Sequence, residues 1–247
     1  MYATFIYNPL YNGFVLLIDA LRFASWIDAG IVVILFTIIV RLILFPISKK
    51  AARTQIMMKL AEPELTALKE KHKNDKQAQA AAMMAFYKEK KINPFSSIVL
   101  LFIQLPILIA LYQIFYVSGL STIHTNILYA FVSVPPAIST HFLGLIDITQ
   151  KSLILALAAA VTQYFQIRLS SPQTKRGADG RLSQEGMMHL MMKFTMPVFV
   201  FFLANGLASA LAIYWTTSNL FMIGQEIYIR RQMAKENQAK TAQTKAA

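Results

Sequence analysis

The stretch Ile31-Val-Val-Ile-Leu-Phe-Thr-Ile-Ile-Val-Arg-Leu-Ile-Leu-Phe-Pro-Ile47 is a helix-length apolar run with one arginine, Arg41, inside it. An arginine at the centre of a membrane span costs about 2.5–3.5 kcal/mol on insertion scales, and such residues usually face a cavity or a partner. Arg41 could instead snorkel, because its long stem can carry the charge toward the membrane surface near Lys49. The apolar residues on both sides of Arg41 favour a polar cavity inside a helix bundle.

Composition sets the class of protein. Of the 247 residues, 56% are hydrophobic and only 15% are charged, whereas ordinary soluble domains have about 25% charged residues. Several apolar runs approach the ~20 residues that cross a bilayer, which predicts an all-α polytopic membrane protein. The absence of cysteine excludes disulfides, thiol catalysis and cysteine metal sites. The net charge is +12, and the Lys and Arg residues lie on either side of the apolar runs. This placement indicates contact with anionic lipid or ribosomal RNA rather than with DNA.

Five membrane spans are predicted, forming a bundle with a cytosolic helical hairpin. The expected division is an amphipathic, interfacial helix outside the cytosol (1–28), span one (29–47), the cytosolic hairpin (48–94), span two (95–117), an outer loop (118–151), span three (152–169), a cytosolic loop (170–189), spans four and five (190–229) and a cytosolic tail (230–247). The pair Asn205-Gly206 is the turn signal between the last two spans. The polar, low-complexity residues 237–247 are expected to be disordered.

The distribution of Lys and Arg predicts the orientation of these spans. Residues 48–94 hold eleven of them and residues 118–150 hold none, while further positive charges follow the third and fifth spans. By the positive-inside rule the N-terminus lies outside and the C-terminus in the cytosol. Residues 1–30 resemble neither a signal peptide nor an Arg-rich transit peptide. We therefore expect a bacterial plasma membrane.

Residues 48–94 are predicted to form two helices joined at Lys73-Asn74-Asp75, because apolar residues recur at helical spacing on both sides of that turn. Pro63 is expected to kink or restart the first helix. The positive charges of this segment could instead form no more than a solvated helix face and the signal that keeps the segment in the cytosol.

Catalytic chemistry finds little support in the chain. The four histidines lie apart without metal-ligand spacing, and no Gly-x-Ser-x-Gly or P-loop motif occurs. The clear span interiors contain no Asp or Glu, which weakens a proton-coupled pump. We expect no enzyme activity, no cofactor and no metal.

Uncharged polar residues recur within the spans. Thr37 lies four residues before Arg41 on the same helix face. Each such residue alone is explained by an interhelical hydrogen bond worth about 0.6 kcal/mol. Together with an arginine that needs solvation, the set predicts a shared hydrophilic groove. The candidate groove residues are Thr37, Arg41, Gln104, Gln163, Tyr214, Trp215 and Ser218.

These features occur together in one known family. The arginine in the first span, the charged segment opening Ser48-Lys-Lys-Ala, and Ile92-Asn-Pro-Phe before Gln104-Leu-Pro-Ile resemble the YidC/Oxa/Alb membrane insertases. Two further motifs match its last two spans, Phe194-Thr-Met-Pro-Val-Phe-Val-Phe-Phe202 and Leu211-Ala-Ile-Tyr-Trp-Thr-Thr-Ser-Asn219. The resemblance covers about residues 5–235.

The resemblance implies a five-helix core whose groove is open to cytosol and lipid and closed on the outer side. Arg41 would be the positive residue of the groove, Thr37 and Trp215 would contact the incoming segment, and Gln104 and Gln163 would be further lining. The chain departs from the family's Gram-negative pattern in having no extra span and no large periplasmic domain before Arg41. It also lacks the lipoprotein cysteine of many Gram-positive members, and its tail is only mildly basic.

The expected function is transfer of hydrophobic segments of nascent membrane proteins from cytosol to bilayer, without ATP. The expected partners are nascent membrane proteins and anionic lipids, with the ribosome and the Sec translocon as further candidates and no DNA. One alternative is a small anion transporter or channel that uses Arg41 as its binding site, although no internal repeat supports it. Another is a scaffold for the assembly of other membrane proteins.

Overall fold

The computed structural model describes residues 2–24, 26–93, 96–117, 123–170 and 184–246. Most of these residues are helical, which confirms the all-α class. In chain order the elements are η1 (Ala3–Tyr7), α1 (Asn8–Leu21), α2 (Ala29–Ile43), α3 (Phe45–Lys71), α4 (Lys76–Glu89), α5 (Ser96–Tyr112), η2 (Gln113–Val117), η3 (Thr125–Ile127), β1 (His141–Phe142), β2 (Ile146–Asp147), α6 (Leu153–Ser170), α7 (Gln184–Gly206) and α8 (Ser209–Ala246).

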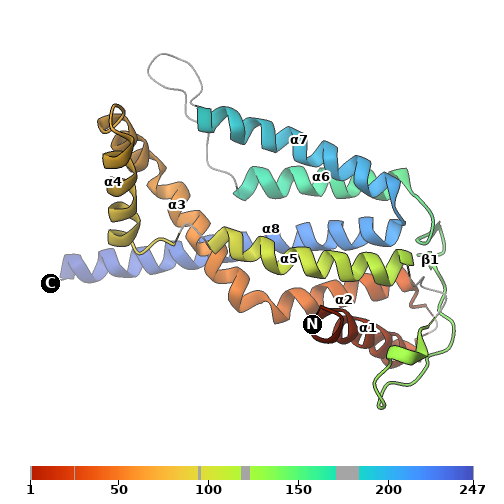
Figure 1. Cartoon of the computed structure of the whole chain (residues 1–247). Coiled ribbons are helices and arrows are strands. Elements are labelled where there is room, and N and C mark those ends of the chain that lie inside the picture. Colours follow the sequence, from red (N-terminus) through yellow and green to blue (C-terminus); the bar gives the residue numbers. More distant parts are fainter. Residues whose placement is uncertain (1, 25, 94–95, 118–122, 171–183, 247) are drawn as a thin grey trace.

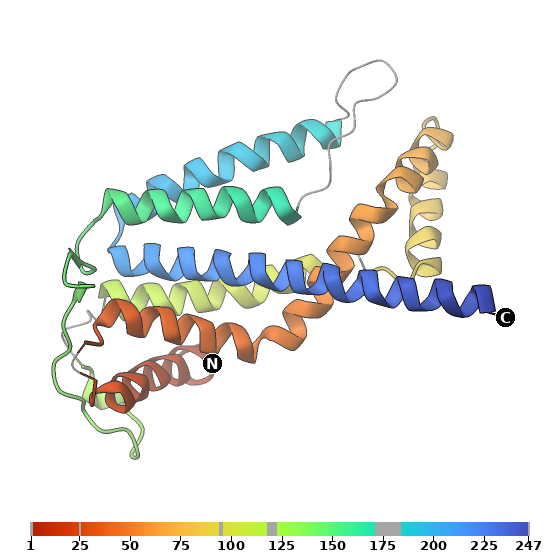
Figure 2. The ribbon, with the colours of Figure 1, turned by 180° about the vertical axis from the view of Figure 1, so that it is seen from behind.

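The helices form an elongated bundle (Figure 1). Helices α2, α5, α6, α7 and α8 run alongside one another, and α8 lies between α6 on one side and α2 on the other. Helices α3 and α4 project from one end, whereas β1 and β2 lie at the opposite end (Figure 2). We refer to these as the hairpin end and the strand end of the bundle.

Helix length and apolarity single out α6 in the described part of the chain. This helix alone is long and apolar enough to cross a membrane, and α2 with α3 meets the same criterion only as a pair bent by 71°. The apolar stretches Gln104–Phe115 and Leu190–Gly206 are shorter. Helix length and apolarity alone therefore do not identify five full-length spans. One reason is that α8 carries the polar run Tyr214–Asn219.

The first predicted span is broken, which differs from the continuous helix expected over residues 29–47. Helix α2 ends at Ile43 and α3 begins at Phe45, with Pro46 in its first turn. Proline has no N–H, so the carbonyl of Leu42 has no helical donor and the chain bends there. Helix α3 includes Pro63 without interruption, so the restart expected at Pro63 occurs at Pro46 instead.

Two expectations for the last helices are wrong. Asn205 and Gly206 are the last residues of α7, and the break to α8 lies at residues 207–208. The expected disordered tail is helical through Ala246, because α8 continues without a break. Its Ala, Gln and Lys residues are good helix formers. The predicted cytosolic loop falls largely on residues 171–183, including Lys175 and Arg176, which lie outside the described residues.

The main core joins α1 to the bundle. Helix α1 has a buried face that contains Tyr11, Asn12, Phe14, Val15 and Ile18. The Phe14 ring makes edge contacts with Phe36 of α2 and Phe115 of η2, each at 5.5 Å between ring centroids. The amphipathic N-terminal helix is therefore packed beside α2 and α5, while Trp26 after it is 73% exposed.

A second core cluster between α6, α7 and α8 consists mainly of alanine. Its buried residues are Ala156, Ala159, Val200, Ala204 and Ala212. Small side chains let helix backbones approach closely, which is the usual device for packing helices in a membrane. A third, smaller cluster joins α3 to α4 through Leu65 and Phe86.

The strand end is fixed to α2 by Asp28. One carboxylate oxygen accepts the N–H of Ile31 at 3.0 Å and caps α2, and the other accepts the N–H of Leu143 at 2.8 Å. The N–H of Ala29 also donates to the carbonyl of Ser139 at 2.8 Å. Asp28 therefore acts both as a helix cap and as the anchor of the loop that carries β1 and β2.

We predict that Asp28→Ala destabilises the protein by about 0.5–2 kcal/mol, the usual cost of a lost helix cap, and also releases residues 139–145. The matched control is Asp75→Ala, because Asp75 caps α4 through Gln77 and Ala78 without any contact to that loop. Hydrogen exchange of the loop amides should accelerate only in the Asp28 variant. Equal exchange in both variants would contradict the anchoring role.

Candidate functional site

Helix α8 carries two polar stripes. The first polar stripe is Tyr214, Ser218 and Gln225, and the second is Trp215, Asn219 and Glu226. In both stripes the residues are spaced i, i+4, i+11, which keeps each stripe on one helix face. A shift of one residue turns the second stripe by about 100°. All members except Trp215 are at most 8% exposed.

The first polar stripe binds one polar side chain from each of three helices. The Tyr214 hydroxyl accepts a hydrogen bond from the Gln104 amide of α5. The Ser218 hydroxyl accepts two from the Arg41 guanidinium of α2, with 2.8 Å between Nε and Oγ. The Gln225 side-chain oxygen accepts one from Ser48 of α3 at 3.1 Å. This face of α8 thus holds α5, α2 and α3 through polar contacts.

Arg41 is half-buried and points at α8 rather than along α2 to the hairpin end. Besides Ser218, the Tyr214 hydroxyl interacts with its guanidinium. Among the described residues, ion pairs join carboxylates to Arg22, Arg53 and Arg230, and none joins a carboxylate to Arg41. Within the same parts of the chain, the guanidinium therefore contacts hydroxyl groups and no carboxylate.

Thr37 is not directed at an open groove. Its side chain is 2% exposed, and its hydroxyl donates to the Val33 carbonyl one turn earlier at 2.7 Å. Such a bond within one helix satisfies the hydroxyl without another partner. Thr37 lies on the Arg41 helix as predicted from the sequence, but its hydroxyl bonds to Val33 on its own helix and not to the first polar stripe.

The second polar stripe faces α6. The Trp215 indole donates to the Gln163 side-chain oxygen at 3.0 Å. The Asn219 amide donates to the Thr162 hydroxyl at 3.3 Å, and Glu226 accepts a hydrogen bond from Ser170. Six of the seven candidates therefore lie in two sets, and Thr37 belongs to neither. Arg41, Gln104, Tyr214 and Ser218 are brought together on one side of α8, and Gln163 and Trp215 on the side toward α6.

A junction at the hairpin end links α3, α6 and α8. The Leu169 carbonyl in the last turn of α6 accepts from Arg230 at 3.0 Å and from the Lys59 ammonium at 3.2 Å. Cations are favourable at this negative end of a helix. Arg230 also pairs with Glu226 at 2.6 Å. Burial lowers the pKa of the Lys59 ammonium, and the Arg230 charge lowers it further.

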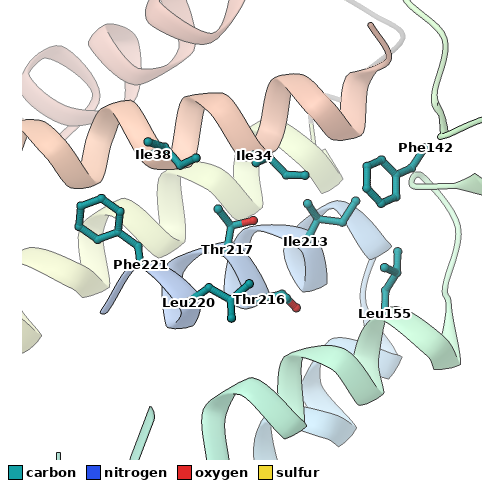
Figure 3. A pocket seen from close by; sticks show the side chains of 9 residues that line it. All are labelled: Ile34, Ile38, Phe142, Leu155, Ile213, Thr216, Thr217, Leu220 and Phe221. Atoms are coloured by element: carbon teal, nitrogen blue, oxygen red, sulfur yellow. The ribbon is translucent and has the colours of Figure 1, made fainter. Parts of the chain in front are cut away.

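An apolar cavity of about 380 Å³ lies between α2, α8 and α6 (Figure 3). Its lining residues are Ile34, Ile38, Phe142, Leu155, Ile213, Thr216, Thr217, Leu220 and Phe221. The cavity and the first polar stripe occupy neighbouring faces of α8. Among the described residues, no group of three His, Cys, Asp or Glu side chains could hold a metal ion.

Sequence reasoning missed Ser48, Ser170 and Gln225 as parts of these contacts. A usable signal was present, because Gln225 and Glu226 repeat the spacing of the Tyr214 and Trp215 stripes eleven residues later. The partners on α3 and α6 gave no signal of their own, since a single serine near a helix end is common.

Comparison with known proteins places the chain in a family. Residues 22–237 match the family model described as 60Kd inner membrane protein. A Clostridium tetani protein named membrane protein insertase YidC is 33% identical over 214 residues, which cover 86% of each chain. The chain belongs to the YidC/Oxa/Alb family.

Two more relatives carry the same name. The YidC of Clostridium perfringens is 31% identical over 245 residues, covering 94% of this chain and 96% of that protein. The YidC of Tolumonas auensis is 32% identical over 235 residues, covering 95% of this chain and 38% of that protein. The YidC family belongs to the cell membrane and is not a family of enzymes, which confirms the expectation that this chain is not one.

We predict that Glu226→Gln lowers the free energy of unfolding by about 1.5–3 kcal/mol, the usual worth of a hydrogen bond to a charged group. Glu226 is 7% exposed in its pair with Arg230, whereas Glu70 is 73% exposed in its pair with Lys73. The control Glu70→Gln should therefore cost less than about 1 kcal/mol. Unfolding in one detergent measures both variants, and equal losses would refute the importance of the junction.

Proposed function

We propose that this protein is a membrane protein insertase, which takes hydrophobic segments of nascent membrane proteins from the cytosol into the bilayer. Its relatives carry that name over most of this chain. The observation that carries the mechanism is the Arg41 guanidinium, held inside the bundle by Ser218 with no carboxylate partner among the described residues. A cation in this position attracts an anionic group of another molecule.

The proposed client contact is electrostatic. A nascent helix with a short acidic N-terminal tail approaches from the hairpin end, and the tail binds Arg41 in place of Ser218. A charge pair at about 4 Å is worth about 1 kcal/mol in water and about 4 kcal/mol at an effective dielectric constant of about 20. This attraction offsets part of the cost of removing the tail from water.

The proposed driving force is hydrophobic and needs no ATP. Once the tail is held, the apolar client segment moves sideways into lipid, and burial of its apolar surface drives the step. The lipid would meet the outward faces of α6 and α7, which expose large apolar side chains. These include Ile154, Leu157, Val161, Phe165, Phe199 and Phe202.

The proposed topology has five crossings. They are α2, α5 with η2, α6, α7 and the first part of α8, joined so that the strand end is outside and the hairpin end is in the cytosol. The eleven Lys and Arg of residues 48–94 support this orientation. The same positive charges would bind anionic lipid headgroups. The helical C-terminal part of α8 would contact the ribosome or a translocon as further partners.

We predict that Arg41→Leu reduces insertion of an acidic-tailed client by roughly fivefold or more, since the pair that it removes is worth about 1–4 kcal/mol. Stability should not fall, because removing the arginine also removes an insertion cost of about 2.5–3.5 kcal/mol. The control Arg22→Leu affects an exposed pair with Asp19 and should leave insertion unchanged. The assay is protease protection of the client tail in proteoliposomes with matched protein amounts.

Two results would contradict this mechanism. One is undiminished insertion by Arg41→Leu. The other is an equal defect with a client whose tail carries Asn in place of Asp, because a neutral tail has no charge for Arg41 to attract. Anion flux lost in Arg41→Leu without an insertion defect would instead favour a transporter.

We further predict that a nascent chain contacts the Arg41 side of α8. A photo-crosslinking residue at Gln104 should react with a ribosome-stalled, single-span client, and the yield should rise and fall as the chain lengthens. Gln163 is the matched control, because it is also a half-buried glutamine but bonds to Trp215 on the other side of α8. Crosslinks from Gln163 alone would put the client in the α6–α8 seam and refute capture by Arg41.

A further inference from the structure

The apolar cavity lies on the side of α8 that faces away from the two polar stripes. Four of its lining residues on α8 recur at the spacing i, i+3, i+4 and i+7 and so share one helix face. They are Ile213, Thr216, Thr217 and Leu220. At about 100° per residue, the centre of this face lies about 180° from the midpoint between the two stripes. The cavity is therefore a feature separate from the polar contacts of α8.

The cavity presents apolar surface and opens outward. Seven of its nine lining residues are aliphatic or aromatic, and the hydroxyl oxygen of Thr216 is itself buried. Leu220 lines the cavity and is also 55% exposed, so the cavity reaches the outer surface of the bundle. Water needs two to four polar partners in such a space. In a bilayer, an open apolar cavity is therefore filled by a hydrocarbon group rather than by water.

The length of the cavity matches one leaflet. Figure 3 shows Phe142 at one end of the cavity and Phe221 at the other. On α8 the lining extends from Ile213 to Phe221, which is about 12 Å at about 1.5 Å per residue. Half of the hydrocarbon core of a bilayer is about 15 Å thick. An acyl chain that enters from the strand end would therefore fill the cavity while remaining in its own leaflet.

Lys151 places a positive charge just beyond the strand end of the cavity. The residue before it, Gln150, has a carbonyl that accepts the N–H of Ser209 at 2.9 Å and the Ser209 hydroxyl at 2.6 Å. These bonds fix residue 151 beside the first residue of α8, one helical turn before the cavity begins. Lys151 is exposed, and among the described residues no ion pair joins it to a carboxylate. The acidic residue nearest to it in sequence, Asp147, accepts two hydrogen bonds within its own turn.

We propose that the apolar cavity binds one acyl chain of an anionic phospholipid whose phosphate group pairs with Lys151. The glycerol and ester groups of the lipid then lie along the turn between Lys151 and the cavity. Charge complementarity selects the headgroup, because a Lys near the membrane surface attracts anionic lipid, whereas a zwitterionic headgroup carries a cation of its own.

The bound chain fills a space that the protein leaves open, since α2 and α6 pack against α8 far more than against each other. The site lies in the leaflet at the strand end, opposite the lipid contacts proposed for the charges of the hairpin end. The proposal depends on the proposed topology of the bundle and on no step of client insertion.

The test compares two photoactivatable phospholipids that carry the same diazirine-labelled acyl chain, one a phosphatidylglycerol and the other a phosphatidylcholine. Each is added at a low molar fraction to phosphatidylcholine proteoliposomes that contain the full chain, and the labelled residues are identified by peptide mass spectrometry. The anionic probe should label the cavity lining about fivefold more than the zwitterionic probe, which corresponds to about 1 kcal/mol. Both should label the outward residues Val161 and Phe165 of α6 equally.

Two variants separate the headgroup contact from the chain contact. Lys151→Gln changes an exposed residue and should abolish the preference for the anionic probe, whereas the control Lys73→Gln changes an exposed lysine of the hairpin and should keep it. Leu220→Trp should cover the mouth of the cavity and reduce labelling of its lining by both probes. The control Leu157→Trp enlarges a residue that is 47% exposed without lining the cavity and should have no such effect.

Two results would overturn the proposal. Equal labelling of the cavity by both probes in the unaltered protein would show that the surrounding bilayer lipid enters it without selection. Labelling of Phe165 without any labelling of the cavity would show that something other than lipid, such as a helix of another protein, covers it. No client is present in this experiment, so its outcome is independent of the insertion assays.

Discussion

The structure depends on one constraint, that polar groups carried into apolar surroundings must be paired with one another. Helix α8 meets this constraint on two faces at once, with Ser218 bonded to Arg41 on one and Trp215 bonded to Gln163 on the other. Since each bond is directional, it fixes the rotation of α8 about its axis as well as its neighbours. The alanine cluster against α6 and α7 then allows close packing without specifying that rotation.

The pairing of the polar groups differs between the two faces of α8. Toward α6, the polar groups form a continuous series that ends in the buried Glu226–Arg230 pair, where opposite charges balance. Toward α2, the oxygen atoms that Arg41 meets within the described parts of the chain are neutral. Among the described residues, the face toward α6 thus pairs its charge with an opposite charge, whereas the face toward α2 does not, and the proposed binding of an acidic tail rests on this difference.

The helical class, the inward role suspected for Arg41 and the turn capped by Asp75 could all be predicted, because composition, an isolated charge and capping residues are local signals. The division of the polar residues into two sets could not be predicted. Tyr214 and Trp215 are neighbours in sequence, yet about 100° of helical rotation directs them to different partners, and periodicity does not say which helix each face meets. Pro46 was expected to end the first span, but the immediate bend into a second helix was not expected, since the apolar run continues to Ile47.

Because the chain bends by 71° between α2 and α3, a small rotation at the bend would move the far end of α3 a long way. Helix α3 has 27 residues, about 40 Å at about 1.5 Å per residue, and it pivots at Leu44. A rotation of about 10° at that pivot would carry the far end of α3 through about 7 Å by this geometry. The Lys59 hydrogen bond to Leu169 acts on this helix near its middle. Together with the Ser48–Gln225 and Arg53–Glu236 contacts to α8, this bond would restrain such a displacement of the α3–α4 hairpin.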